Sequence, residues 1–323
     1  MKLATIDDGS RDGSLVVVSR DLSRAILVTD IAKTLQDALD RWQEAEPLLR
    51  QRAKSLEDGG ADTIDFAAAS VKAPLPRAWQ WLDGSAFDSH GELMSKVFGM
   101  DPLPRDRALM YQGVSDQFYG PREDVPFPRE ADGIDFEGEF GVIVDEVPLG
   151  ISAADAAEHI RLIVQINDWS LRVIAPIEMK TGFGWIQAKP PCSVAPVAVT
   201  PDELGPNWRD GRVDLPLLVD WNGERFGAAN GYEMSSSFPE LVAHAARTRR
   251  LCAGTIIGSG TVSNANYREV GSSCIAERRG IEMLDEGAPR TAFMQFGDTV
   301  RMEAVTAQGA PLFGAIDQKV VAA

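Results

Sequence analysis

The sequence predicts an α+β fold made mostly of β-strands, in which a small N-terminal α+β domain precedes a larger domain. After residue 73, most apolar segments are short and bounded by turn residues, and only two stretches, near 152–165 and 238–249, have obvious helical periodicity. Many strands with few helices between them favour a largely antiparallel or mixed sheet over a doubly wound parallel one. At 323 residues the chain is long enough for one large core, or for a large and a small one.

The N-terminal domain is expected to span residues 1–72. Up to about residue 30, short apolar runs alternate with turn signals such as "DDGSRDG", which indicates an antiparallel meander. A helix should follow and end at Gly59 and Gly60, because apolar residues recur at spacings of three and four: Leu35, Ala38, Leu39, Trp42, Ala45 and Leu49. Two prolines in "KAPLPRAW" favour a boundary near residue 73, so the second domain would span 73–323.

Composition and charge exclude several classes of partner. With 32 basic and 48 acidic residues, the net charge of −16 argues against nucleic acid or an anionic membrane as partner, since both need a basic surface. No apolar run approaches the 18 or so residues of a membrane span, and the start of the chain lacks a signal-peptide core, so we expect a cytoplasmic protein. Three cysteines without C-x-x-C spacing indicate neither a disulfide framework nor a zinc site, and buried free thiols are expected.

The stretch "GIDFEGEFGVIVDE" at 133–146 reads as a strand with acidic residues on one face. Successive side chains of a strand alternate, so Asp135, Glu137 and Glu139 share a face opposite the apolar residues. Their backbones would place the two glutamates roughly 7 Å apart, close enough to converge on a point between them. That face either meets water, as one face of an antiparallel sheet commonly does, or meets a cation.

Further candidates lie at strand ends and in turns. Asp83 stands in "QWLDGSAFDSH", seven residues before His90, and "IVQINDWSLR" runs from an apolar segment into Asp168. Each aspartate alone is typical of a solvated turn. His159 and His244 lie in segments of helical periodicity and are expected at helix surfaces, which leaves His90 as the candidate functional histidine.

Together these stretches resemble the fumarylacetoacetate hydrolase family, particularly its shorter bacterial members. The resemblance covers about residue 73 to the C-terminus, whereas the N-terminal domain matches in position and size only. It implies a mixed β-sandwich roll for the larger domain and a homodimer. The matching stretches are "DGSAFDSH", "YQGVSD", "GIDFEGEFGVIV", "NDWSLR", the lysine of "QAKPPCSVAPV", "GSGTVSN" and "GSSCIAERR".

The resemblance implies a site for a divalent cation, which would be held by Asp83, Glu137, Glu139 and Asp168. Carboxylate oxygens without Cys or His suit Mg²⁺ or Ca²⁺ rather than zinc. Four carboxylates and one divalent ion leave an excess of negative charge, and a partly buried site needs nearby cations to compensate it. The resemblance supplies Lys189 and Arg172 for this purpose.

The resemblance also implies a general base, His90, paired with Glu277. A carboxylate bonded to one ring nitrogen fixes the tautomer and makes the other nitrogen a better proton acceptor. Glu269 competes for the carboxylate role, because the spacing from Thr261 to Glu277 is long for the family.

Other family positions would bind the substrate. Lys189 and Arg172 would bind its anionic groups or a developing oxyanion, and the hydroxyl groups of Tyr111 and Thr261 would touch it. Ala175 departs from larger members, which carry glutamine there, so the oxyanion site is expected to differ. The glycine-rich "GSGTVS" lacks the following Lys-Ser/Thr of a P-loop and is interpreted as only a turn.

The expected function is hydrolysis of a carbon–carbon bond in a diketo acid, first of all fumarylacetoacetate, in the breakdown of tyrosine. The cation would polarise the substrate oxygens, and the His90–Glu277 pair would activate a water that attacks the adjacent carbonyl. Fumarylpyruvate or acylpyruvate hydrolysis, or decarboxylase, isomerase or hydratase chemistry on the same fold, are alternatives. A divalent-ion-binding module without catalysis is a further alternative, although it would have no use for His90 or Lys189.

Overall fold

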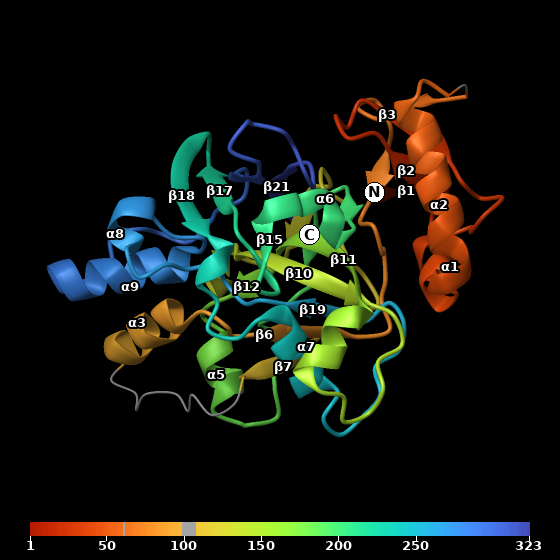
Figure 1. The fold of residues 1–323 in the computed structure, drawn as a ribbon. Coiled ribbons are helices and arrows are strands. Elements are labelled where there is room, and N and C mark those ends of the chain that lie inside the picture. The colour runs from red at the N-terminus through yellow and green to blue at the C-terminus, as the bar shows by residue number, and fades with distance from the viewer. Residues whose placement is uncertain (61, 99–107) are drawn as a thin grey trace.

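The computed structural model describes residues 1–60, 62–98 and 108–323, and its fold is α+β with most elements in sheets (Figure 1). The N-terminal region contains the expected antiparallel meander of β1 (Lys2–Ile6), β2 (Ser14–Val18) and β3 (Arg24–Leu27). Two short strands extend it, β4 (Ile64–Asp65) beside β3 and β5 (Val71–Lys72) beside β1.

The single helix expected before Gly59 is divided at Arg41 into α1 (Leu35–Asp40) and α2 (Trp42–Glu57). Arg41 leaves the helical region, with φ −137° and ψ 43°. Thr34 caps α1 by accepting a hydrogen bond from the Asp37 backbone N–H at 3.1 Å. The apolar face is buried as predicted, because residues three and four apart lie on the same side of each helix.

The N-terminal meander continues into the sheet of the rest of the chain. In the described residues this sheet has 12 strands, with a main order of β4-β3-β2-β1-β14-β11-β10-β19-β6-β7, and β19 and β6 are its parallel pair. It thus runs across the expected boundary near residue 73, and the division into domains 1–72 and 73–323 stays a prediction. Its remaining strands are β6 (Trp81–Gly84), β7 (Met110–Gly113), β10 (Gly138–Val144), β11 (Ile160–Asn167), β13 (Ser193–Val194), β14 (Ala198–Val199) and β19 (Ile256–Gly258).

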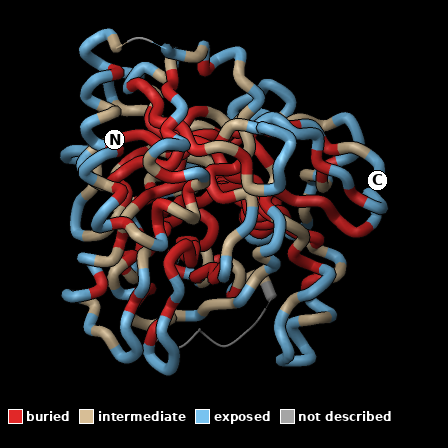
Figure 2. Tube along the Cα trace, turned by 90° about the vertical axis from the view of Figure 1, so that its right-hand side faces the viewer, coloured by how far each residue is buried: buried red, intermediate tan, exposed pale blue. Residues whose placement is uncertain are grey.

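A second sheet, of five strands, has the order β18-β17-β20-β21-β8 and packs on the first through a shared apolar core. Gln165 of β11 links the sheets, since its amide donates to Met302 O at 2.9 Å and accepts from Ala304 N at 2.8 Å. The five strands are β8 (Val125–Phe127), β17 (Pro216–Trp221), β18 (Glu224–Asn230), β20 (Thr299–Ala304) and β21 (Ile316–Ala322). Two small ladders pair β9 (Ile134–Asp135) with β12 (Ser170–Leu171), and β15 (Trp208–Arg209) with β16 (Arg212–Val213). Figure 2 shows the buried segments gathered in the interior.

The prediction of a helix near 152–165 is wrong for most of this stretch. Only α4 (Ala153–Ala156) and the 3₁₀ helix η2 (Ala157–His159) are helical, and the chain continues as strand β11 from Ile160. Because β11 is covered on both faces, its sequence is almost continuously apolar and lacks the alternation that marks a half-exposed strand. The second expected helix is present as α7 (Phe238–Ala245), which a Ser237–Glu240 capping box begins.

The remaining helices surround the sheets, and α3, α8 and α9 lie on the side of the molecule away from α1 and α2 (Figure 1). Helix α3 packs against α9, which brings two candidate site segments together. None of the helices in the described ranges is long and apolar enough to cross a membrane. The bounds are α3 (Asp88–Phe98), α5 (Ala175–Met179), α6 (Pro201–Leu204), α8 (Tyr267–Val270), α9 (Ile275–Glu286), η1 (Glu130–Asp132), η3 (Gly205–Asn207) and η4 (Gly231–Glu233).

Candidate active site and metal centre

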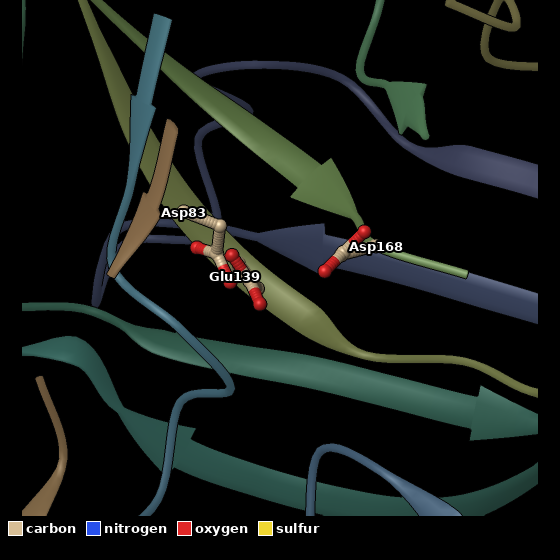
Figure 3. A group of neighbouring side chains, drawn as sticks. All are labelled: Asp83, Glu139 and Asp168. Atoms are coloured by element: carbon tan, nitrogen blue, oxygen red, sulfur yellow. The ribbon is translucent and has the colours of Figure 1, made fainter. Parts of the chain in front are cut away.

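Three carboxylates from the large sheet meet in the interior. Asp83 lies on β6, Glu139 on β10 and Asp168 directly after β11, and one oxygen of each lies within 4.8 Å of the others. Figure 3 shows the three side chains gathered in one region between their strands. All three residues are buried, with exposed fractions of 6%, 0% and 0% in chain order.

Burial decides between the two interpretations of the acidic strand face. The single strand expected at 133–146 is divided into β9 (Ile134–Asp135) and β10 (Gly138–Val144). Asp135, Glu137 and Glu139 are nevertheless all buried, so a water-facing acidic surface is wrong for this stretch. Strand β10 lies between β11 and β19 inside the large sheet. Its apolar side chains share a hydrophobic core with those of the second sheet. The carboxylates therefore face one another and the side chains around them instead of solvent.

Glu139 is the strongest indication of a cation. Neither of its carboxylate oxygens accepts a hydrogen bond from a residue in the part of the chain that the structure describes. Burial and the neighbouring Asp83 and Asp168 raise the pKa of Glu139 well above its usual value, and burial and Asp168 also raise the pKa of Asp83. A divalent ion would supply the positive charge that this arrangement lacks.

Gly258, which has no side chain, leaves space for two of these carboxylates. A Cβ added to Gly258, which pairs with Asp83 in the β19–β6 ladder, would lie 2.4 Å from Asp83 Oδ1 and 3.0 Å from Glu139 Oε2. A larger residue would therefore displace both oxygens. All the gathered ligand atoms are hard carboxylate oxygens, so the donor set fits Mg²⁺, Ca²⁺ or a similar ion.

Glu137, the fourth predicted ligand, lies outside this group of three. Its Oε1 accepts hydrogen bonds from Lys189 Nζ at 2.5 Å and Ser170 Oγ at 2.6 Å, and Thr261 donates to its Oε2. Arg172 Nη2 lies 3.1 Å from Oε1 without hydrogen-bond geometry. Burial opposes ionisation of Glu137, but Arg172 and Lys189 prevail and hold its pKa well below the usual value.

Lys189 joins Glu137 to the group of three, because its Nζ also donates to Asp168 Oδ2 at 2.6 Å. Burial would lower the pKa of Lys189, but Asp168 and Glu137 raise it, so the amine is charged. Tyr111 donates its hydroxyl to the same Asp168 oxygen at 2.7 Å. Cys192, which the sequence analysis did not assign, donates its thiol to Asp168 Oδ1 at 3.0 Å. Both oxygens of Asp168 are thus held in place.

Arg172 connects the carboxylates to helix α9 through Asp135. Its Nε donates to Asp135 Oδ2 at 2.7 Å, and the backbone N–H groups of Ile275 and Ala276 donate to Asp135 at 2.7 and 2.9 Å. An aspartate at this place satisfies N–H groups that have no partner within the helix. Asp135 thereby fixes the start of α9, where Glu277 is the third residue. The sequence pattern placed Asp135 on the acidic face, but it did not predict the contacts of Asp135 with Arg172 and the start of α9.

His90 and Glu277 lie close together where α3 packs against α9. His90 Nδ1 is 3.8 Å from Glu277 Oε1, which is longer than a hydrogen bond, and Ser263 donates to the same oxygen. Glu277 is fully buried, whereas Glu269, the competing carboxylate, is exposed on α8 and accepts from Asn266 at 3.1 Å. The structure thus brings Glu277, and not Glu269, to His90.

The glycine-rich stretch at 258–264 does more than turn the chain. The backbone N–H of Gly260 donates to Asp83 Oδ1 at 3.0 Å, Thr261 donates to Glu137, and Ser263 donates to Glu277. Gly260 has φ +78°, and a Cβ there would lie 2.4 Å from Gly84 O, so glycine is required. The interpretation as only a turn is wrong, because this segment holds three carboxylates of the site.

Comparison with known protein families gives matches along nearly the whole chain. A family model described as "Fumarylacetoacetate (FAA) hydrolase C-terminal" matches residues 80–321, and one described as "Fumarylacetoacetase N-terminal domain 2" matches residues 1–77.

Curated relatives match over shorter segments. A 2,4-didehydro-3-deoxy-L-rhamnonate hydrolase of Sphingomonas sp. (strain SKA58) is 27% identical over 163 residues, which are 50% of this chain and 54% of that protein. A human mitochondrial oxaloacetate tautomerase is 23% identical over 168 residues, 50% of this chain and 49% of that protein. The chain thus spans about half the length of these two curated relatives.

Two solved structures share the fold over the whole chain. A maleylpyruvate hydrolase from Sphingobium sp. SYK-6, in complex with manganese(II) and pyruvate, has a TM-score of 0.67 and 18% identity, covering 100% of this chain and 99% of that one. A probable 2-hydroxyhepta-2,4-diene-1,7-dioate isomerase from Mycobacterium abscessus has a TM-score of 0.69 and 18% identity, with the same coverage of 100% and 99%.

Proposed function

Because the chain belongs to the fumarylacetoacetate hydrolase family, we propose that it hydrolyses a carbon–carbon bond in a diketo acid with the help of a divalent cation. The first candidate substrate is fumarylacetoacetate, cleaved to fumarate and acetoacetate. One observation carries the proposal: three buried carboxylates have an oxygen each within 4.8 Å, and a charged lysine donates to one of them. The segment that holds Asp83 through Gly260 also holds, through Ser263, the Glu277 that lies beside His90.

The proposed cation is Mg²⁺ or Ca²⁺, held by Asp83, Glu139 and Asp168. When bound, it would supply Lewis-acid polarisation of two substrate oxygens in a 1,3 relation. The manganese ion in the maleylpyruvate hydrolase structure supports a divalent ion at this fold. Coordination by Glu137 stays a prediction, because that carboxylate is paired with Lys189.

Lys189 and Arg172 are the proposed binding groups for the negative charges of the substrate. Lys189 keeps its charge in the buried site, and Arg172 Nη2 makes no hydrogen bond within the described chain. Charge-assisted hydrogen bonds from both would fix a carboxylate more firmly than neutral donors. Tyr111 and Thr261 donate to Asp168 and Glu137, and would reach the substrate only by turning their hydroxyl groups.

His90 is the proposed general base, and Glu277 orients it. Once the 3.8 Å separation closes to a hydrogen bond, Glu277 would fix one ring nitrogen, and the other would take a proton from water as its oxygen attacks the ketone carbon. The carbon–carbon bond then breaks, and its electrons move into the enolate of the released fragment. His90 then gives the proton that it took from water to the enolate carbon, so that the fragment leaves with a new carbon–hydrogen bond and the base is neutral again.

Isomerase or tautomerase chemistry is the second candidate. Relatives with that activity in their names match this chain, and proton transfer at an enolisable carbon needs the same base and cation but no attacking water. The family resemblance further leads us to propose a homodimer that acts in tyrosine breakdown, and the sequence pattern leads us to propose a cytoplasmic location. Size-exclusion chromatography with light scattering tests the dimer.

The substrate test compares three diketo acids on one Mg²⁺-loaded preparation. We expect kcat/KM to be highest for fumarylacetoacetate, lower for fumarylpyruvate and lowest for acetylpyruvate, because the first two carry a second carboxylate for the two cations. A tenfold preference for acetylpyruvate would refute the dicarboxylate assignment. Oxaloacetate tautomerised or decarboxylated faster than any diketo acid is hydrolysed would favour the second candidate.

A further inference from the structure

A loop tied to its own base lies beside the site, between Leu171 and Lys189. Leu171 N donates to Ala188 O at 2.8 Å and closes the base of the loop. The Glu178 carboxylate accepts from the backbone N–H groups of Ile186, Gln187 and Ala188 at 3.1, 3.0 and 3.0 Å. These bonds fix the end of the loop that leads into Lys189, although its outer residues, such as Phe183 at 97% exposure, meet solvent.

Trp185 is the loop residue that turns inward to the site. Its ring packs edge-on against Tyr111, with centroids 4.8 Å apart at an angle of 71°. Lys189 Nζ lies 5.6 Å from the Trp185 ring centroid and 5.3 Å from that of Tyr111. The indole thus lies against Tyr111 and Lys189, two of the three side chains that donate to Asp168.

The indole N–H of Trp185 is buried and has no acceptor among residues 1–60, 62–98 and 108–323. A buried donor without a partner is costly, and the polar end of a buried tryptophan usually finds one. Trp81 and Trp221 also have unpartnered N–H groups. Their recorded ring contacts are with phenylalanines, however, whereas Trp185 contacts two site residues.

We propose that Trp185 is a substrate-binding residue of this enzyme. Its N–H donates to a carboxylate oxygen of the anionic substrate, while Lys189 binds the same end and the aromatic rings of Trp185 and Tyr111 lie against its planar conjugated part. Ala175, earlier in the same loop, has no side-chain donor to offer. The assignment rests on the proposed function, because it requires an anionic diketo acid next to Lys189.

The experiment uses oxalate, a dianion with two adjacent carboxylates and no bond that this chemistry cleaves. Its affinity for the Mg²⁺-loaded protein is measured by calorimetry before and after Trp185→Phe, which keeps an aromatic ring and removes the N–H. We expect oxalate to bind about tenfold more weakly, equivalent to about 1.4 kcal/mol. The affinity for Mg²⁺ alone should not change, because the Trp185 N–H donates to none of the three carboxylates.

Trp221→Phe is the matched control, since it removes another unpartnered indole N–H and should leave oxalate affinity unchanged. Equal oxalate affinity for Trp185→Phe and the unaltered protein would overturn the proposal, as would an unaltered Mg²⁺-loaded protein that does not bind oxalate. An equal loss in Trp221→Phe would also overturn it, because the effect would then not be specific to the site. Failure of the proposed function is seen separately, as absent hydrolysis of all three diketo acids by the unaltered enzyme.

Discussion

Lys189 Nζ lies 2.5 Å from Glu137 Oε1 in a part of the protein where both side chains are only 7% exposed. The same ammonium reaches Asp168 at 2.6 Å, so one cation holds a carboxylate outside the group of three and one within it. A buried charge left without its partner destabilises a protein strongly, whereas removing both charges costs much less. A single and a double variant can therefore distinguish the contribution of Lys189 to stability from its contribution to catalysis.

We expect Lys189→Met to abolish turnover and to lower the free energy of unfolding by about 3 kcal/mol, because Glu137 and Asp168 lose a buried partner. The double variant Lys189→Met/Glu137→Gln should recover part of that stability but no turnover. Urea unfolding followed by circular dichroism measures the first effect, and diketo-acid hydrolysis measures the second. Recovery of turnover in the double variant would contradict a catalytic role for Lys189.

Removal of the cation should abolish activity. We expect prolonged chelation to eliminate turnover and millimolar Mg²⁺ to restore it, because Lys189 offsets only part of the charge of the buried carboxylates and neither Glu139 oxygen has a hydrogen-bond donor within the described chain. Glu139→Gln should prevent restoration and should raise the melting temperature of the chelated protein. Glu269→Gln, at the exposed competing carboxylate, is the control and should behave like the unaltered protein. Full activity after verified removal of all divalent ions would end the metal hypothesis.

The stability of the metal-free protein should depend on pH through Glu139 and Asp83. Both have pKa values raised above the ordinary range, first by burial, so in this state the folded protein binds more protons than the unfolded chain above about pH 4. Stability is therefore lost as the pH rises through the raised pKa values. We expect the melting temperature of the chelated protein to fall, relative to Glu139→Gln, as the pH rises above about 4, the ordinary pKa of a carboxyl group. A constant difference between the two proteins above this pH would contradict the raised pKa of Glu139.

His90→Ala should reduce the chemical step on the order of 10²- to 10⁴-fold while the fold and metal content survive. Glu277→Gln should cause a smaller loss, because Glu277 orients the base without taking the proton. His159→Ala is the control, since His159 lies 2.7 Å from Asp145 at the end of η2 and should not affect turnover. Single-turnover rates check the three variants, and an equal loss in His159→Ala would show that His90 has no special role.

The sequence contained the chemistry of the site but little of its geometry. Alternation along 133–146 put Asp135, Glu137 and Glu139 on one face, and the family resemblance assigned roles to Asp83, Asp168 and His90. The sequence pattern left open whether the acidic face met water or a cation, because one strand carries no information about what covers it. It also predicted a helix where β11 lies, since a strand buried on both faces has no alternation.

Local sequence determined the residue types, the N-terminal meander and the buried face of α1 and α2, and the resemblance of its motifs to a family implied a carboxylate cluster with cations near it. Only the tertiary structure decided which groups meet. It buried the acidic face, turned Glu137 towards Lys189, brought Glu277 to His90 in preference to Glu269, and placed Cys192, Asp135 and Trp185 at the site. These relations join residues far apart in the chain, and the burial that gives their charges such large effects exists only once the two sheets have packed.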